Sequence, residues 1–136
     1  MKGILCVSHG FYAEVFKESL KMIAGNVTNL HALCLEPTDG PEQFKDKLVA
    51  IQPTLDAYDK VWVFADLFGG SPCNTTFQHY VSNPNIEFVA GMNFPMVLSA
   101  LLSEEISLDS CIEQGKDAIV NVRTFTQAMM ANDEDE

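Results

Sequence analysis

The hydrophobic run KVWVFADL, residues 60–67, constrains the fold of this chain more than any other feature. Its side chains are apolar on both faces of an extended segment, which is typical of a central strand in a parallel sheet covered by helices on both sides. The sequence FGGSP follows at residues 68–72. It predicts a helix with Ser71 as N-cap and Pro72 at the first helical position. A buried strand is therefore expected to pass directly into a helix.

Strand and helix patterns alternate along the rest of the chain. Further strands are predicted at residues 2–8, 30–35, 86–93 and 118–125. Apolar residues at helical spacing predict helices at residues 11–24, from Pro41 to about 55, from 94 to 102 and from about 107 to 115. In the first of these helices the apolar stripe is Val15, Phe16, Leu20 and Ile23. The alternation predicts a three-layer α/β/α sandwich around a mainly parallel sheet of about five strands.

The size and composition of the chain suit one domain. At 136 residues and 47% hydrophobic content it can build a single core. Its apolar runs fall short of the roughly 20 residues that a membrane-spanning helix needs. Because Met1 and Lys2 lead directly into a strand, no signal peptide is expected, and the predicted location is the cytoplasm, with a possible peripheral association with a membrane complex.

Acidic residues dominate the charge. Eight Lys and Arg against 19 Asp and Glu give a net charge of −11, which argues against a nucleic-acid partner and suits docking to a basic protein surface. Four of the acidic residues are the last four of the chain. The sequence thus predicts a domain over residues 1–125 and a flexible acidic tail over residues 126–136.

The cysteines and two of the histidines suggest structural roles. Cys6, Cys34, Cys73 and Cys111 are widely spaced, form no CxxC pair and are interpreted as reduced core or near-core thiols. His31 and His79 are each isolated within their own element. The pattern predicts no metal site.

Four short polar residues are predicted to meet at one edge of the sheet. His9 follows the first strand, Asp66 ends the third, Ser71 opens the next helix, and Asn93 follows the fourth strand. In open α/β sheets ligands bind beyond the carboxyl ends of the strands, where the strand order reverses. These four side chains are therefore the candidate functional site.

The chemistry of these residues suggests a phosphohistidine carrier. An exposed imidazole titrates near neutral pH, and Asp66 could hold one ring nitrogen of His9 and leave the other as a nucleophile. The glycines of GGSPCN, residues 69–74, let the backbone approach a ligand, and the free N–H groups of the helix start favour an anion such as a phosphoryl group. Two alternatives remain: Asp66 as an ordinary turn or capping carboxylate, and a non-catalytic domain whose His9 rim binds an anion.

Three segments resemble one known family. VSHGFYAEVFKESLKMIAG (residues 7–25), VFADLFGGSPCN (63–74) and VAGMNFPMVLSALL (89–102) are similar, in this order and spacing, to the EIIA component of the mannose-type sugar phosphotransferase system. The resemblance extends over about residues 2–124. It rests on three separate matches: His-Gly after the first strand, Asp-x-x-Gly-Gly-Ser-Pro-x-Asn after the third, and Gly-x-Asn-x-Pro-Met after the fourth.

The resemblance implies a phosphotransferase role. His9 would accept a phosphoryl group from phosphorylated HPr and pass it to a histidine of a IIB component, which phosphorylates sugar entering through membrane IIC and IID components. Asp66 would orient the imidazole, Ser71 would bind the phosphoryl oxygens, and Gly69 and Gly70 would keep the approach open. No cofactor or metal is needed, because the phosphoryl donor is another protein's phosphohistidine.

The resemblance also implies a docking rim and a homodimer. The residues bordering the docking surface would be Gly10, Phe68, Met92, Asn93 and Phe94. The family fold has a last antiparallel strand that can be exchanged between two subunits, and residues 118–125 are the candidate for it.

Several points stay open at this level. Cys73 departs from the residues common at its position in relatives, and is interpreted as a packing substitution, with redox sensitivity as the alternative. Since the chain stops after QAMMANDEDE, a separate IIB chain is expected. A regulatory or dihydroxyacetone-kinase-type phosphocarrier of the same fold is the main alternative function. The sequence does not indicate which sugar is transported.

Overall fold

The computed structural model describes residues 1–135, whose centre is a parallel sheet. Its four strands are β1 (Lys2–His9), β2 (Leu30–Leu35), β3 (Lys60–Ala65) and β4 (Ile86–Ala90), in the order β2-β1-β3-β4. Every adjacent pair is parallel, so all four carboxyl ends lie at one edge of the sheet.

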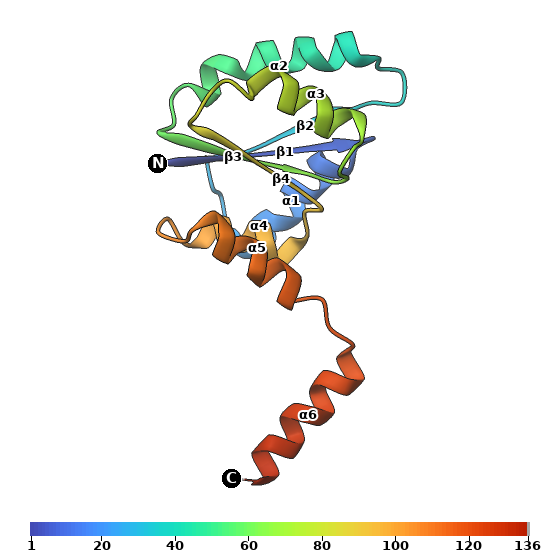
Figure 1. Cartoon of the computed structure of the whole chain (residues 1–136), viewed down its shortest axis with the longest axis vertical. Helices are drawn as coiled ribbons and strands as arrows, with labels where there is room; N and C mark the ends of the chain where they lie inside the picture. Colours follow the sequence, from blue (N-terminus) through green and yellow to red (C-terminus); the bar gives the residue numbers. More distant parts are fainter. Residues whose placement is uncertain (136) are drawn as a thin grey trace.

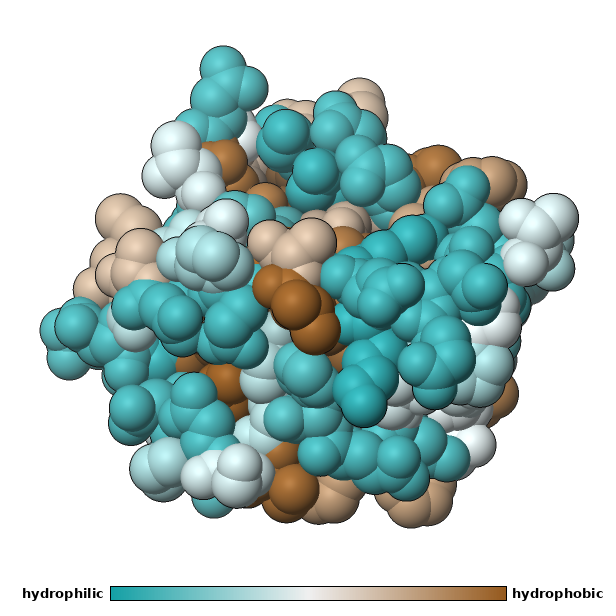
Figure 2. Space-filling model, turned by 90° about the horizontal axis from the view of Figure 1, so that it is seen from above, coloured by the Kyte–Doolittle hydropathy of each residue, from teal (hydrophilic) through white to brown (hydrophobic). Residues whose placement is uncertain are grey.

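Helices cover both faces of this sheet (Figure 1). The α1 (Tyr12–Ala24), α4 (Phe94–Leu102) and α5 (Leu108–Asp117) helices lie on one side, and the α2 (Pro41–Leu55) and α3 (Ser71–Tyr80) helices lie on the other. The three-layer α/β/α prediction is confirmed. The outer surface over α2 and α3 is mostly hydrophilic with scattered apolar residues, as Figure 2 shows, so this layer contributes to the core mainly through its inner face.

Alternate side chains of the central strands build two separate cores. Ile4 and Cys6 of β1 point towards α1, α4 and α5, whereas Leu5 and Val7 point towards α2 and α3. All four are fully buried. This is the pattern that period-two alternation produces in a strand covered on both faces. The central position of β1 and β3 fixes where their carboxyl ends, and hence His9 and Asp66, can lie.

The order of the strands places the topological switch point of the sheet between β1 and β3. After β1 the chain crosses to β2 on one side, and it then returns to form β3 on the other side of β1. The helices that follow β1 and β3 therefore diverge to opposite faces of the sheet (Figure 1). Such a switch point is where parallel α/β sheets leave room for a ligand or a partner.

The predicted fifth strand at residues 118–125 is wrong for this structure. Residues 118–121 lie outside regular helix and strand, and α6 (Val122–Asp135) follows them. The β-branched residues of AIVNVRTF favour a strand, but a strand needs a hydrogen-bonded neighbour. A helix satisfies its backbone internally, and Gln127, Ala128, Met129 and Met130 are good helix formers. Within the described chain the sheet thus has four strands and no antiparallel one.

The α6 helix projects away from the sandwich (Figure 1). Every residue from Lys116 to Asp133 is exposed, including the apolar Val122, Phe125 and Met129. The α6 helix runs across residue 125, the predicted boundary between the domain and a flexible tail, and this division stays a prediction. Residue 136 of the predicted tail lies outside the described residues. None of the helices in the described part of the chain is long and apolar enough to cross a membrane.

The apolar stripe predicted on α1 needs correction. Phe16 and Leu20 are buried as expected, but Val15 and Ile23 are each 62% exposed, and Ala13 takes the third buried position. The buried face is narrower than the sequence suggested, because α1 meets the sheet along the 13-16-20 line only. Apolar residues beside this line stay on the surface.

A buried lysine joins the start of the sheet to the end of α4. The Lys2 side chain is fully buried, with its ammonium 4.0 Å from the centroid of the Trp62 ring. Its Nζ donates a hydrogen bond of 3.2 Å to the carbonyl oxygen of Ser103, the C-cap of α4. A cation at a helix C-terminus is favourable, although burial lowers the pKa of Lys2. Lys2 thus holds α4 against the edge opposite His9.

Replacing Lys2 with Ala is expected to lower the free energy of unfolding by about 2 kcal/mol, because a desolvated cation–π contact and a buried hydrogen bond are both lost. Lys60→Ala is the matched control, since its ammonium lies 5.3 Å from the same ring and its residue is exposed. Urea denaturation of both variants measures the difference. Equal losses would show that the buried contact adds nothing.

Candidate functional site

His9 is the last residue of β1 and faces solvent at the carboxyl edge of the sheet. Its side chain is 45% exposed. Gly10 follows with φ of 56°, a left-handed conformation that turns the chain from the strand into α1. The Gly10 N–H donates to Leu35 of β2 over 2.8 Å, and the buried hydroxyl of Ser8 accepts from the N–H of Ala13 over 2.7 Å. These bonds brace the backbone on both sides of the imidazole.

Asp66 holds His9 at two points. It follows the last residue of β3, the strand beside β1. Its Oδ2 lies 2.9 Å from His9 Nδ1 and accepts the His9 backbone N–H over 3.0 Å. The sequence prediction that these two residues meet is correct. Because Oδ2 is an acceptor, Nδ1 carries the proton and Nε2 is left with a free lone pair.

The second carboxylate oxygen of Asp66 is buried and has no hydrogen-bond partner among the described residues. The side chain as a whole is 16% exposed. A buried, unpartnered oxygen carries a desolvation cost, and such atoms are uncommon except where a site uses them. Here the unpartnered oxygen belongs to the carboxylate that contacts the His9 ring.

The Gly69–Gly70 turn lies against the opposite side of the imidazole. Gly69 has φ of 83°, which favours glycine. A Cβ added to Gly70 would lie 2.5 Å from His9 Cε1 and 3.1 Å from Nε2. The absence of a side chain at Gly70 therefore lets the turn approach the ring, and places the start of α3 near the free nitrogen.

The N-terminus of α3 differs by one residue from the prediction. Gly70 is the N-cap and accepts the first helical hydrogen bond, from the N–H of Asn74 over 2.9 Å. Ser71 is the first helical residue and Pro72 the second, so Ser71 is not the N-cap. The exposed Ser71 hydroxyl is left available for a ligand, and the N–H groups of a first turn have no acceptor within the helix.

The other predicted rim residues have different surroundings. Phe68 is 84% exposed beside the glycine turn. Asn93 is half-buried: its Oδ1 accepts from Met96 N–H at the start of α4, and its Nδ2 donates to the Gly115 carbonyl of α5 over 2.8 Å. Phe94 packs edge-on against the core residue Phe16. These bonds give Asn93 a structural explanation, and its role in docking stays a prediction.

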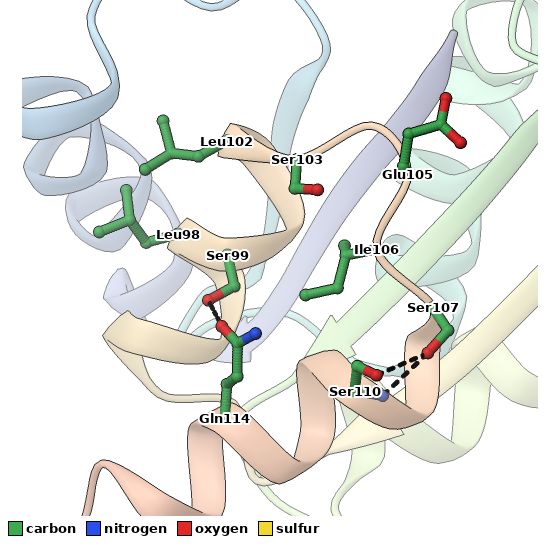
Figure 3. A pocket seen from close by; sticks show the side chains of 9 residues that line it. All are labelled: Leu98, Ser99, Leu102, Ser103, Glu105, Ile106, Ser107, Ser110 and Gln114. Atoms are coloured by element: carbon green, nitrogen blue, oxygen red, sulfur yellow. Dashed lines mark hydrogen bonds between the residues drawn. The ribbon is translucent and has the colours of Figure 1, made fainter.

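A cavity of about 680 Å³ lies away from His9, between α4 and α5 (Figure 3). Leu98 and Leu102 of α4 and Ile106 of the connection line it, and Gln114 accepts a hydrogen bond from Ser99 across it. It shares no residue with the His9 rim. The candidate site is instead an open surface, where a reactive imidazole can meet a protein face.

Metal-binding and redox side chains do not gather at this site. Within the described residues no group of three or more His, Cys, Asp and Glu could hold a metal ion. The four cysteines are free thiols. Burial raises the pKa of the Cys6 thiol to about 12, which makes that thiol unreactive. Cys73 is half-buried and packs against the core beneath α3, which agrees with its interpretation as a packing residue.

Known proteins are similar to this chain in sequence and in fold. The family model described as "PTS system fructose IIA component" matches residues 3–116. The chain is 35% identical over 101 residues to the sorbose-specific EIIA component of Lacticaseibacillus casei, covering 74% of this chain and 72% of that protein. It is 27% identical over 128 residues to the fructose-specific EIIA component of Bacillus subtilis, covering 93% and 83%.

A solved structure agrees with these matches. The PTS IIA protein associated with the fucose utilization operon of Streptococcus pneumoniae has a TM-score of 0.86 at 26% identity, covering 92% of this chain and 96% of that one. The chain therefore belongs to the mannose-type EIIA family of the sugar phosphotransferase system. The family supports a phosphocarrier role in sugar transport.

Two residues around His9 received no role from the sequence analysis. Ser8 braces the start of α1, and Asn74 donates to the carbonyl of Gly69. Asn74 is the last residue of the Asp-x-x-Gly-Gly-Ser-Pro-x-Asn motif, so its position in the motif could have indicated a role at the site. No comparable indication exists for Ser8, because a serine within a hydrophobic run does not show which backbone group its hydroxyl will bind.

Gly70→Ala is expected to displace the His9 ring, since the new methyl group would overlap Cε1. Gly69→Ala meets no atom within 4 Å but strains a left-handed backbone, at about 1–2 kcal/mol. NMR of the histidine side chains and thermal unfolding separate the two effects. The Gly70 variant should shift His9 signals more, and the Gly69 variant should lose more stability; the reverse order would contradict this geometry.

Proposed function

We propose that His9 is the phosphoryl acceptor of this chain, that Nε2 is the reacting nitrogen, and that HPr phosphohistidine is the donor. The observation that carries the proposal is the 2.9 Å contact between Asp66 Oδ2 and Nδ1. It leaves Nε2 as the nucleophile beside an open surface. A IIB component then receives the phosphoryl group and delivers it to sugar.

The proposed step needs no external proton or oxidant. The lone pair of His9 Nε2 forms a bond to phosphorus as the bond from phosphorus to the donor's imidazole nitrogen breaks. The electron pair of that broken bond returns to the donor ring. The His9 ring becomes cationic while Nδ1 keeps its proton, and the adjacent Asp66 carboxylate stabilises this charge. Transfer to IIB is the same exchange with His9 as the donor.

The start of α3 supports the phosphoryl group in this proposal. Ser71 would offer its hydroxyl, and the backbone N–H groups in the first turn of α3, which follows Gly70, have no acceptor within the helix. Pro72 has no N–H, so the donors in this turn are few and their positions matter. The acceleration of phosphoryl transfer would come from positioning the phosphoryl group and from electrostatic stabilisation of its charge.

The wider setting follows from the family. We infer that a IIB component accepts the phosphoryl group, that IIC and IID components carry the sugar through the membrane, and that this protein acts in the cytoplasm. No nucleic-acid partner is proposed for a chain of charge −11. The relatives are named for sorbose and for fructose, and one for a fucose utilization operon, so their names do not indicate one sugar for this chain.

The direct test is intact-mass analysis after incubation with phosphoenolpyruvate, enzyme I and HPr. Wild-type protein should gain one phosphoryl group that is lost in acid and stable in base. His9→Ala should gain none, whereas His79→Ala, a control at the far end of α3, should behave as wild type. Absence of uptake by the wild type would instead favour a regulatory or anion-binding domain of this fold.

Asp66→Asn in the same assay tests the orientation of the ring. An amide can present its NH₂ group to Nδ1, which favours the wrong tautomer, so transfer should slow by about 10²-fold without being abolished. The rate of phosphoryl uptake measures this. A rate equal to that of the wild type would remove Asp66 from the mechanism.

We further propose a homodimer, as the family resemblance implies. Its support is the exposed apolar Val122, Phe125 and Met129 of α6, because a helix of 14 residues is marginal in water when nothing covers it. Sedimentation should give twice the chain mass of 15.0 kDa, and deletion of residues 118–136 should shift the protein towards monomer. A monomeric wild-type chain at about 100 μM would contradict the proposal.

A further inference from the structure

Asn74 makes two hydrogen bonds back onto the glycine turn. Its side-chain Nδ2 donates to the carbonyl of Gly69 over 3.1 Å, and its backbone N–H donates to the carbonyl of Gly70 over 2.9 Å. The second bond belongs to α3 and would survive any side chain. The first depends on the amide alone.

The turn has little else to close it. Its own backbone bond, from Gly70 N–H to the Leu67 carbonyl, is long at 3.4 Å. Phe68 and Gly69 are exposed, and Gly69 has the conformational freedom of glycine. The backbone N–H of Asn74 ties Gly70 to α3, and the side-chain amide of Asn74 is the hydrogen bond that ties Gly69 to the same helix.

Movement of the Gly69–Gly70 turn would change the surroundings of the His9 ring. The imidazole lies between Asp66, which contacts Nδ1, and Gly70, which approaches Cε1 and Nε2. A more mobile turn would leave the contact between Asp66 and Nδ1 intact, but Gly70 would no longer stay packed beside Nε2. The distance from Nε2 to the first N–H groups of α3 would then vary.

We propose that Asn74 is a positioning residue for phosphoryl transfer: its amide holds the Gly69–Gly70 turn against the imidazole, so that Nε2 and the start of α3 keep one separation. Asn74 acts through the turn and does not itself touch the reacting atoms. This inference rests on the proposed phosphorylation of His9. It adds a residue to that reaction, because the hydrogen bonds between Asp66 and His9 do not involve Gly69.

Asn74→Leu tests the proposal, because the leucine side chain has nearly the same shape as that of asparagine but no N–H group. Leucine also has the higher helix propensity, so α3 should keep or gain stability. Gln78→Met, an exposed position one turn further along α3, is the matched control. Phosphorylation by phospho-HPr should lose about tenfold in kcat with little change in KM for Asn74→Leu, and should be unchanged for Gln78→Met.

Two further measurements separate positioning from a merely structural role. NMR of the His9 ring should show shifted signals in Asn74→Leu at an unchanged melting temperature. In a double variant with Gly70→Ala, the loss of rate should be no greater than in the worse single variant, because both act through one turn. Additive losses, or a rate loss that parallels a lowered melting temperature, would overturn the inference.

The outcome is distinguishable from failure of the proposed function. If wild-type protein accepts no phosphoryl group, the reaction itself is wrong, and the His9 signals alone decide whether Asn74 holds the turn. If the wild type is phosphorylated and Asn74→Leu matches it in kcat, the phosphocarrier proposal stands and the role of Asn74 is wrong.

Discussion

The site depends on the parallel pairing of β1 with β3. Their register sets Val7 opposite Ala65, and the N–H of Asp66 donates to the carbonyl of Val7 over 3.2 Å. Asp66, one residue beyond Ala65, and His9, two residues beyond Val7, therefore lie at the same edge, where the Asp66 carboxylate reaches both the backbone and the ring of His9. A change of register by one residue would turn both side chains to other faces.

The remaining parts of the site are attached to this pair. The Gly69–Gly70 turn starts three residues after Asp66 and folds back onto the imidazole, and α3 begins where the turn ends. Asp66 and Gly70 lie against the ring, and nearly half of the His9 side chain stays exposed. That openness suits exchange with a protein surface, and the hollow between α4 and α5 lies away from the rim.

Much of the fold could be predicted because its strands are buried on both faces. The continuous apolar runs at β1 and β3 have no alternative explanation as surface segments, and the glycine and proline residues that follow them mark the turns. Predictions failed where burial was one-sided or absent. Val15 and Ile23 fit a helical stripe but lie beside the line of contact. At residues 118–125 the β-branched pattern predicted a strand, yet no neighbouring strand pairs with it, and α6 forms instead.

The sequence by itself determined the parallel α/β class, the placement of His9 and Asp66 at one edge of the sheet, and the glycine turn, because each follows from local pattern and from the rule that parallel strands end at one edge. Tertiary structure decided which atoms meet. The choice of Nδ1 for Asp66, the approach of Gly70 to Nε2 and the bond from Asn74 to Gly69 depend on distances of about 3 Å between segments far apart in the chain or across a turn. Such distances arise only when both strands and the helix are packed, since no local pattern specifies them.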